Sequence, residues 1–534
     1  MTTDVSALSL LPRLDWRFLG DPCLGETVFL GDAGHPMLTA LQAVDATVAV
    51  NPPLPHRAGF DTAVVVAPLE DTLRQAAGLL RPGGRLYVQL SRSATPWQRP
   101  SSLRRWRDLA SGAGFGEIAA YWHVPSFEGC AHVVPISDRH ALHQVARRHQ
   151  GTTRGAFKSA MLHLATSARA TPCVAADVSM VARLRSDATT ASGPDTTSVA
   201  ADATTRLLVT PRFRTSRHVV RLASDPVTRA GLVVKLPRIS TDTSGIAHEA
   251  AVLRELAERW PAGRGTFPVV RALHVEGHPA LVETKVRGTV LTHRYVARRP
   301  AESVRAVRSW IESLPVSGST STDPQWFGRL VEQPLSELAQ WESAGNSTGL
   351  SELVRRTVAA ASLLCDHDLP LVFEHGDVTC PNVFMDRDGR ISLVDWELAE
   401  PAGLPGTDMM HFLAFVSFAV AGVHDVPGQV RAFHDSFFGP RPWAARLARS
   451  HLRQRGVDEQ LLAPLMLATW GRYAAKIGPR LRRLATTVDG ESPRLIASVI
   501  ARDRDVAIWR SLVTSGVTNR RTASFEPEEP PWVI

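Results

Sequence analysis

Cysteine, lysine and long apolar runs are all scarce in this chain of 534 residues, and each shortage excludes a class of protein. The five cysteines are scattered, odd in number and without the spacing of a metal site; they stand at positions 23, 130, 173, 365 and 380. This pattern argues against a disulfide framework and against a zinc module. It favours reduced thiols in a cytoplasmic protein.

No apolar run is long enough to cross a membrane. The most apolar stretch, residues 409–423, contains His411 and is shorter than the roughly 20 residues that a membrane helix needs. We expect it to be a core helix, and we expect no stable membrane insertion. The first residues lack the basic flank and the apolar core of a signal peptide, so the expected location is the cytoplasm.

The basic residues form no dense tract. The net charge of +8 comes mostly from arginine, since the chain has only four lysines, at positions 158, 235, 285 and 476. An arginine-rich surface is therefore a simpler interpretation than nucleic-acid binding, which needs a concentrated patch. The oligomeric state cannot be predicted from these features.

The length predicts two domains, because 534 residues exceed one ordinary domain and 44% hydrophobic residues supply two cores. Residues 186–198 are small, polar and aperiodic, which is typical of a flexible linker. We expect a first domain at 1–186, a linker at 187–202 and a second domain at 203–534.

The first domain alternates strand and helix patterns. Apolar strand patterns occur at 27–31, 47–50, 62–66 and 85–90, and helical patterns at 36–45 and 71–80. This alternation predicts an α/β domain with a parallel, doubly wound, Rossmann-like sheet.

The most informative motif spans residues 375–382 and reads His-Gly-Asp-Val-Thr-Cys-Pro-Asn. Asp377 and Asn382 stand five residues apart, and Asp395 follows Asn382 by thirteen. A phosphoryl-transfer site needs one carboxylate to orient and deprotonate a hydroxyl, and further oxygen ligands to hold magnesium. The three residues therefore predict such a site, although Asp, Asn and Gly are also the commonest residues at loop corners.

The residues around the motif predict a β-hairpin. Residues 383–385 and 391–394 are apolar and flank a turn at 386–389, which places Asn382 at the entry of the hairpin and Asp395 at its exit. Paired strands are about 5 Å apart, so both side chains can reach one ion. An amide and a carboxylate oxygen suit Mg²⁺, which keeps several waters and binds phosphate oxygens.

This segment resembles the catalytic loop of the aminoglycoside and choline kinase-like phosphotransferases, which share the protein kinase fold. The resemblance implies that Asp377 is the catalytic base and that Asn382 and Asp395 are metal ligands. It also implies that His375 and Asp408 support the loop, and the stretch Leu-Pro-Gly-Thr that precedes Asp408 matches the family pattern.

The same resemblance implies an α+β, bilobal, kinase-like second domain, with an N-lobe at 203–287 and a C-lobe at 288–534. A domain of this kind would use Mg²⁺ with ATP, or with GTP.

A kinase-like N-lobe must supply a lysine on a strand and a glutamate on the next helix. Lys235 lies in the apolar run 230–236, where a charge is costly without a partner. Glu249, on the helix that begins near residue 246, is the expected partner, and Glu255 is the fallback. Lys235 could instead guard an edge strand, but in a chain that nearly always uses arginine we favour a role on phosphate.

Two further nucleotide contacts are expected. Residues 280–288 resemble the family's hinge, where the backbone from Glu283 to Val286 would meet the adenine. The loop over the phosphates, residues 211–218, contains no glycine, so Ser216 and neighbouring side chains would donate hydrogen bonds instead. This departure leaves open another nucleotide or an enzyme of reduced activity.

The first domain carries a second resemblance. Residues 79–86, Leu-Leu-Arg-Pro-Gly-Gly-Arg-Leu, resemble the late signature of class I S-adenosylmethionine-dependent methyltransferases, and residues 113–115 fit their final hairpin. Their glycine-rich cofactor turn is reduced here to one glycine in register within residues 31–35, and Asn51 replaces an expected acid. We interpret the domain as degenerate and do not expect S-adenosylmethionine to bind, with Asp32 and Glu70 as residual candidates for contact.

The acceptor is predicted only by charge. Residues 401–534 hold 17 Arg and Lys against 12 Asp and Glu, which favours a neutral or anionic small-molecule hydroxyl acceptor. A small-molecule kinase is the leading hypothesis. A bifunctional methyltransferase and kinase, and a catalytically silent nucleotide-binding scaffold, are the alternatives.

Overall fold

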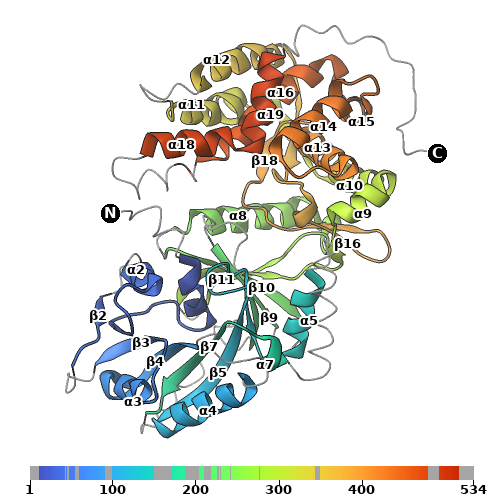
Figure 1. Ribbon diagram of the computed structural model, residues 1–534. Helices are drawn as coiled ribbons and strands as arrows, with labels where there is room; N and C mark the ends of the chain where they lie inside the picture. The colour runs from blue at the N-terminus through green and yellow to red at the C-terminus, as the bar shows by residue number, and fades with distance from the viewer. Residues whose placement is uncertain are drawn as a thin grey trace. The chain divides into compact units, whose positions relative to one another are not determined.

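The computed structural model divides the chain into two compact units (Figure 1). The sheet unit comprises Met1–Ala247 and Val270–Lys285, and the helical unit comprises His248–Val269 and Val286–Ile534. Within them the structure describes residues 11–42, 44, 47–53, 59–90, 99–148, 171–186, 204–209, 218–224, 228, 230–240, 242–275, 277–342, 349–478, 481 and 492–515.

The units have different limits from the predicted domains, 1–186 and 203–534, which stay a prediction. The predicted linker, residues 187–202, lies outside the described residues. The mixed α/β class is confirmed.

The described strands of the sheet unit form one sheet of twelve strands, in the order β11-β12-β10-β9-β8-β6-β5-β7-β4-β3-β1-β2 (Figure 1). Their bounds are β1 Thr27–Leu30, β2 Val48–Val50, β3 Phe60–Val66, β4 Leu80–Leu90, β5 Phe115–Val124, β6 His132–Pro135, β7 Val178–Leu184, β8 Thr204–Val209, β9 His218–Ser224, β10 Gly231–Pro237, β11 Val270–Val275 and β12 His278–Thr284. The helices of this unit are η1 Leu11–Leu19, α2 Pro36–Gln42, α3 Glu70–Leu79, α4 Arg99–Gly112, α5 Arg139–Arg148 and α7 Thr171–Val174.

Strands β1 to β4 pair in parallel, whereas the other described pairs of this sheet are antiparallel. Val28 in β1 packs with α3 and α4 in one core, and its neighbour Phe29 packs with η1 and α2 in another. Both faces are therefore covered, as a parallel sheet requires. The Rossmann-like and methyltransferase-like assignment stays a prediction.

The strands of the predicted first domain and of the predicted N-lobe belong to the same sheet. Strand β6 pairs with β8 through the partners His132↔Val209 and Val133↔Leu208. The core beneath this junction is also shared, because Phe18 and Val133 pack in one cluster with Val234 of β10. The two stretches of sequence thus form one folded body.

A buried ion pair joins the beginning of the chain to the end of β10. Arg238 donates to Asp15 through Nη2 at 2.7 Å and through Nε at 3.1 Å, although 223 residues separate the two positions. Burial raises the pKa of Asp15, and the Arg238 guanidinium opposes this shift. Removing one partner of such a pair costs about 3–5 kcal/mol, because the other charge stays buried.

The helical unit consists mainly of helices and two small sheets, β13-β16-β17 and β14-β15-β18. The strands are β13 Thr289–Val290, β14 Val316–Ser319, β15 Pro370–Glu374, β16 Val383–Met385, β17 Ile391–Leu393 and β18 Glu400–Gly403. The helices are η3 Pro261–Gly263, α9 His293–Arg298, α10 Pro300–Ser313, η4 Thr320–Thr322, η5 Gly328–Glu332, α11 Gln333–Ala339, α12 Leu350–Ala361, η6 Ser362–Asp366, η7 Cys380–Asn382, α13 Thr407–Ala421, α14 Val426–Phe438, α15 Trp443–Gln454, η8 Glu459–Leu461, α16 Leu462–Ala475, α18 Ser492–Ala501 and α19 Arg504–Thr514. Helix α8, Ser244–Arg259, begins in the sheet unit and continues into the helical unit.

Helix α13 confirms the core helix expected near residues 409–423, since it is buried from Thr407 to Ala419. Within the described ranges, no single helix is long and apolar enough to cross a membrane. Helices α13 and α14 reach that length only together, with a bend of 111° between them.

We predict that Phe18→Ala destabilises the whole sheet unit. Phe18 is 2% exposed and packs in the shared core, and removing a buried aromatic ring costs about 3–5 kcal/mol. Calorimetry of the full chain should show a lower melting temperature for one cooperative transition of this unit. Leu69→Ala is the control, because Leu69 is 76% exposed and its truncation should cost less than about 0.5 kcal/mol. Separate melting of residues 1–186, with the remaining strands unaffected, would contradict the shared core.

Candidate active site

The predicted hairpin is present and frames the site. Strands β16 and β17 pair antiparallel from Val383↔Leu393 to Met385↔Ile391. Asn382 ends the short helix η7 directly before β16, and its carbonyl oxygen accepts from the Val394 backbone N–H at 3.0 Å. Asp395 is the next residue after Val394, so Asn382 and Asp395 lie at the same end of the hairpin.

Asp395 has an uncommon backbone conformation. Its φ of +73° lies in the left-handed region, which non-glycine residues rarely occupy. Such conformations cost about 1–3 kcal/mol and cluster at functional sites, where the surrounding structure holds them. This conformation therefore fits a functional role for the Asp395 side chain.

Asn382 is oriented by Asp377. The Asn382 Nδ2 group donates to Asp377 Oδ2 at 2.8 Å and to the Asp377 backbone oxygen at 3.1 Å. Because both hydrogen bonds use the amide nitrogen, the amide oxygen Oδ1 is directed away from Asp377. Asp377, Asn382 and the backbone that leads into Asp395 are therefore close together.

Asp377 is half-buried and electrostatically tuned. Burial raises the pKa of its carboxyl group to about 6, Asp395 adds to the shift, and the positive charges of Lys476 and Arg504 oppose it. The raised pKa makes this carboxylate a better proton acceptor, and its partial exposure leaves it accessible.

Asp408 fixes the loop that carries Asp377. Its buried carboxylate accepts from the backbone N–H of His375 at 2.7 Å and of Gly376 at 2.9 Å. Burial and the neighbouring Glu374 raise the pKa of Asp408, and the two N–H donors oppose this. Only glycine fits at 376, because φ is +79° and a Cβ atom would lie 2.1 Å from the Leu398 oxygen.

His375 links the loop to the hairpin. Its Nδ1 accepts from the Asp377 backbone N–H at 3.2 Å, so the ring proton is on Nε2, which donates to the Val394 oxygen at 3.1 Å. The ring also lies 4.5 Å from that of Trp396. His375 and Asp408 therefore both sit where loop supports are expected.

Lys476 is a residue that sequence reasoning missed. It follows helix α16, donates to the Gly376 carbonyl oxygen and lies 3.7 Å from the centre of the Tyr473 ring. Burial lowers its pKa to about 8, whereas the charge of Asp377 raises it. The only available signal was the scarcity of lysine in the chain.

Helices α13, α16 and α19 contribute further polar groups around Asp377. Arg504 forms a bidentate pair with Asp505 at 2.9 Å and lies over the Phe415 ring. His411 and Tyr473 stack at 3.9 Å, and both are nearly fully buried. In the described part of the chain, neither His411 ring nitrogen nor the Tyr473 hydroxyl has a hydrogen-bond partner.

The predicted nucleotide-binding residues are distributed over both units. In the sheet unit, Lys235 Nζ lies 3.7 Å from Glu283 Oε1, and both side chains are buried. In the helical unit, Glu249 Oε1 accepts from the Trp396 backbone N–H at 2.8 Å. The predicted Lys235–Glu249 pair stays a prediction, and the side-chain role of Glu283 is new, because only its backbone was expected to act.

Two further predicted nucleotide-binding residues are Ser216 and Val286. Ser216 lies outside the described residues, together with most of the glycine-free loop. Val286 is buried, and the hinge before it is joined to β10 by the Lys285 N–H, which donates to the Gly231 oxygen at 3.0 Å.

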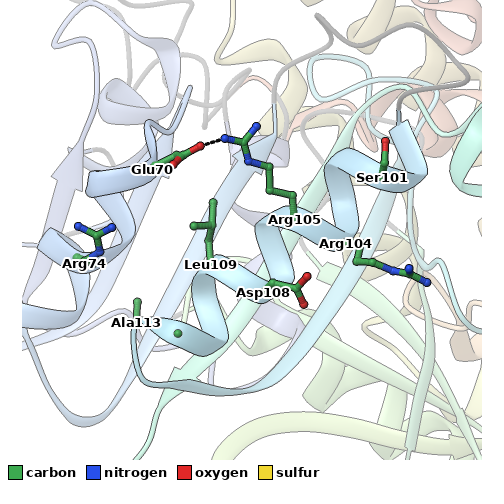
Figure 2. Close-up of a pocket in the computed structure, with 9 residues that line it drawn as sticks. Glu70, Arg74, Ser101, Arg104, Arg105, Asp108, Leu109 and Ala113 are labelled. Carbon is green, nitrogen blue, oxygen red and sulfur yellow. Dashed lines mark ion pairs between the residues drawn. The ribbon is translucent and has the colours of Figure 1, made fainter.

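The sheet unit has a groove of about 850 Å³ between α3 and α4, shown in Figure 2. Glu70, a residual candidate for cofactor contact, points toward Arg105 there and forms an ion pair with it. None of the predicted kinase residues lines the groove.

A hydrogen-bonded Asp–Asn pair beside a second aspartate, on a loop and hairpin, is an arrangement suited to phosphoryl transfer. Residues 215–445 match the model described as the phosphotransferase enzyme family, so this part of the chain is similar to that family. The match confirms the predicted resemblance to this family over these residues, and the predicted enzyme class, a small-molecule kinase. No curated protein matches the chain.

Several solved structures are similar to about half of the chain. An ethanolamine kinase from Plasmodium vivax matches with 12% identity and a TM-score of 0.37, over 55% of this chain and 81% of that one. The choline kinase LicA from Streptococcus pneumoniae matches with 12% identity and a TM-score of 0.34, over 54% and 89%. An aminoglycoside phosphotransferase from Streptomyces rimosus matches with 13% identity and a TM-score of 0.29, over 54% and 90%. Similarities this low carry no conclusion about the activity of this chain.

We predict that Asp408→Asn displaces the catalytic loop. An amide offers one acceptor oxygen in place of two, so one buried backbone N–H loses its partner, at a cost of about 1–3 kcal/mol. We expect a lower free energy of unfolding in urea and a loss of at least ~10-fold in phosphotransferase rate. Asp366→Asn, at an exposed position, is the control. Unchanged stability and rate would show that Asp408 does not hold the loop.

Proposed function

We propose that this protein transfers the γ-phosphoryl group of ATP to a hydroxyl group of a small molecule, in a Mg²⁺-dependent reaction with Asp377 as the base. The hydrogen bond from Asn382 Nδ2 to Asp377 Oδ2 supports this proposal most directly. It joins the candidate base to a candidate metal ligand and fixes both side chains.

Asp377 would act on the acceptor. Its carboxylate keeps one oxygen bonded to Asn382, so the other can accept a hydrogen bond from the acceptor hydroxyl. Because burial raises its pKa to about 6, the group is a stronger base than an exposed aspartate. Orienting the hydroxyl toward the phosphorus contributes at least as much as removing the proton.

The donor set fits Mg²⁺. The orientation of the Asn382 amide presents its oxygen rather than its nitrogen, and Asp395 adds a carboxylate, both of which are oxygen ligands that Mg²⁺ prefers. Asn382 and Asp395 would hold the ion, which in such sites neutralises charge on the phosphate oxygens. The paired strands of the hairpin fix the backbone positions of both residues.

Lys235 is the proposed phosphate contact. In the sheet unit its ammonium is buried beside Glu283, and Lys235 is the last residue of β10 that pairs with β12. Glu249 stays the proposed helix partner, and Ser216 stays a proposed donor to phosphate. The choice between ATP and GTP depends on backbone contacts near Val286.

The acceptor is proposed to be neutral or anionic. Two positive side chains, Lys476 and Arg504, lower the pKa of Asp377 by their charge and therefore lie near it. A polycationic acceptor would meet repulsion from Lys476, whereas the charge of Arg504 is offset by its bidentate pair with Asp505.

A catalytically silent scaffold is the second candidate. It is favoured by one observation, the loop of residues 211–218 that contains no glycine. A bifunctional enzyme would additionally bind S-adenosylmethionine, which we do not expect.

We predict that Asp377→Asn lowers the phosphotransferase rate by ~10²–10⁴-fold, since a general base typically contributes this factor. Transfer of labelled phosphate from ATP to a pool of neutral and anionic hydroxyl compounds would measure it. Chelation of Mg²⁺ by EDTA should abolish the same signal. Asp388→Asn, in the exposed hairpin turn, is the matched control and should keep the wild-type rate. Transfer that survives both Asp377→Asn and EDTA would rule out this mechanism, and its absence from the wild type would support the scaffold.

We predict that Lys476→Met slows the reaction without weakening nucleotide binding. The ammonium donates to the Gly376 carbonyl beside Asp377, and a charged hydrogen bond is worth about 1.5–3 kcal/mol, or roughly 10- to 100-fold in rate. Steady-state kinetics should show a lower kcat and an unchanged KM for the nucleotide, with partial recovery in Lys476→Arg. A selective rise in the nucleotide KM would instead place Lys476 on the nucleotide.

A further inference from the structure

A cysteine, a histidine and an aspartate meet in the sheet unit, outside the proposed kinase site. Asp21 and Cys23 lie in the loop between η1 and β1, and His278 is the first residue of β12. His278 Nε2 lies 3.0 Å from Asp21 Oδ1, and Cys23 Sγ lies 3.9 Å from His278 Nδ1. The two ring nitrogens thus have different partners.

This arrangement favours a proton relay over a metal site. One ion cannot bind both nitrogens of the same ring, and Asp21 already contacts the nitrogen that is farther from the sulfur. A donor at Nε2 directed to Asp21 leaves the Nδ1 lone pair facing the thiol. Nucleophile, base and orienting acid then stand in line, as in activated cysteine sites.

The loop is held in this geometry by a buried arginine. Arg85 donates to the backbone oxygen of Cys23 at 2.9 Å and to that of Asp21. The Cys23 backbone N–H donates to Asp21 Oδ1 at 2.8 Å. The thiol itself is exposed, so reagents can reach it.

We propose that Cys23 is a reactive thiol that exchanges with low-molecular-weight disulfides, assisted by His278 and oriented by Asp21. The proton moves from Sγ to Nδ1, and the thiolate attacks one sulfur of the disulfide R–S–S–R. A mixed disulfide, Cys23–S–S–R, forms as the old S–S bond breaks. The leaving thiolate RS⁻ takes the proton from His278, so the products are the modified protein and RSH.

Three of the other described cysteines do not combine an exposed thiol with such a relay. Cys130 also has a histidine nearby, with His123 Nδ1 at 3.6 Å from its sulfur, but Cys130 and Cys380 are buried, and burial raises the pKa of both thiols. Cys365 is exposed like Cys23, but partial burial and the charges of Asp366 and Glu332 raise its pKa. Cys365 is therefore a built-in reference within the same molecule.

The test is thiol exchange of the full chain with 2,2′-dithiodipyridine at pH 7, with each modified cysteine identified and timed by peptide mass spectrometry. Each rate is divided by the rate of the same cysteine in the urea-unfolded chain. We expect Cys23 to react at least ~10-fold faster than Cys365 on this scale. His278→Gln and Asp21→Asn should each slow Cys23 by ~10-fold and leave Cys365 unchanged.

Equal normalised rates at Cys23 and Cys365 would overturn the proposal, as would a rate at Cys23 that His278→Gln leaves unchanged in a protein of unchanged melting temperature. Micromolar binding of Zn²⁺ that is lost in Cys23→Ser, His278→Gln and Asp21→Asn alike would replace the relay with a metal site. These outcomes do not depend on phosphotransferase activity, so they test Cys23 separately from the proposed function.

Discussion

The catalytic loop depends on one buried carboxylate. Asp408 accepts from two consecutive backbone N–H groups, and this fixes His375 and Gly376 in a turn that only glycine can make at the second position. This conformation of the loop places the Asp377 carboxylate within hydrogen-bond distance of Asn382. Because this carboxylate binds backbone groups rather than an arginine, it holds the loop without bringing a further positive charge to Asp377.

Local sequence was sufficient to predict the loop and the hairpin that carry the candidate residues. The motif from His375 to Asn382, the hairpin that follows and the buried helix near residue 411 are all determined by short-range patterns of apolar residues, turns and glycine. Lys476 and Arg504 could not be predicted in the same way. They reach the neighbourhood of Asp377 only through the packing of helices about a hundred residues further along the chain.

The strand order of the twelve-stranded sheet could not be predicted from local sequence. Individual strands near residues 27, 62, 85 and 231 were recognisable, but the pairing of β6 with β8 was not, because it joins segments on either side of a polar stretch. A polar, aperiodic stretch indicates where the chain leaves a regular element. It does not indicate whether the elements on its two sides later pair, because that involves packing between residues far apart in the sequence, such as Phe18 with Val133 and Val234.

The position of β8 inside the twelve-stranded sheet limits where the chain can be divided into fragments. A fragment that began at residue 203 would leave the backbone donors and acceptors of β8 on one side without their partners in β6. An unpaired strand of this kind invites pairing with other molecules. A phosphotransferase fragment cut at this point would therefore expose a strand edge that the intact chain keeps paired.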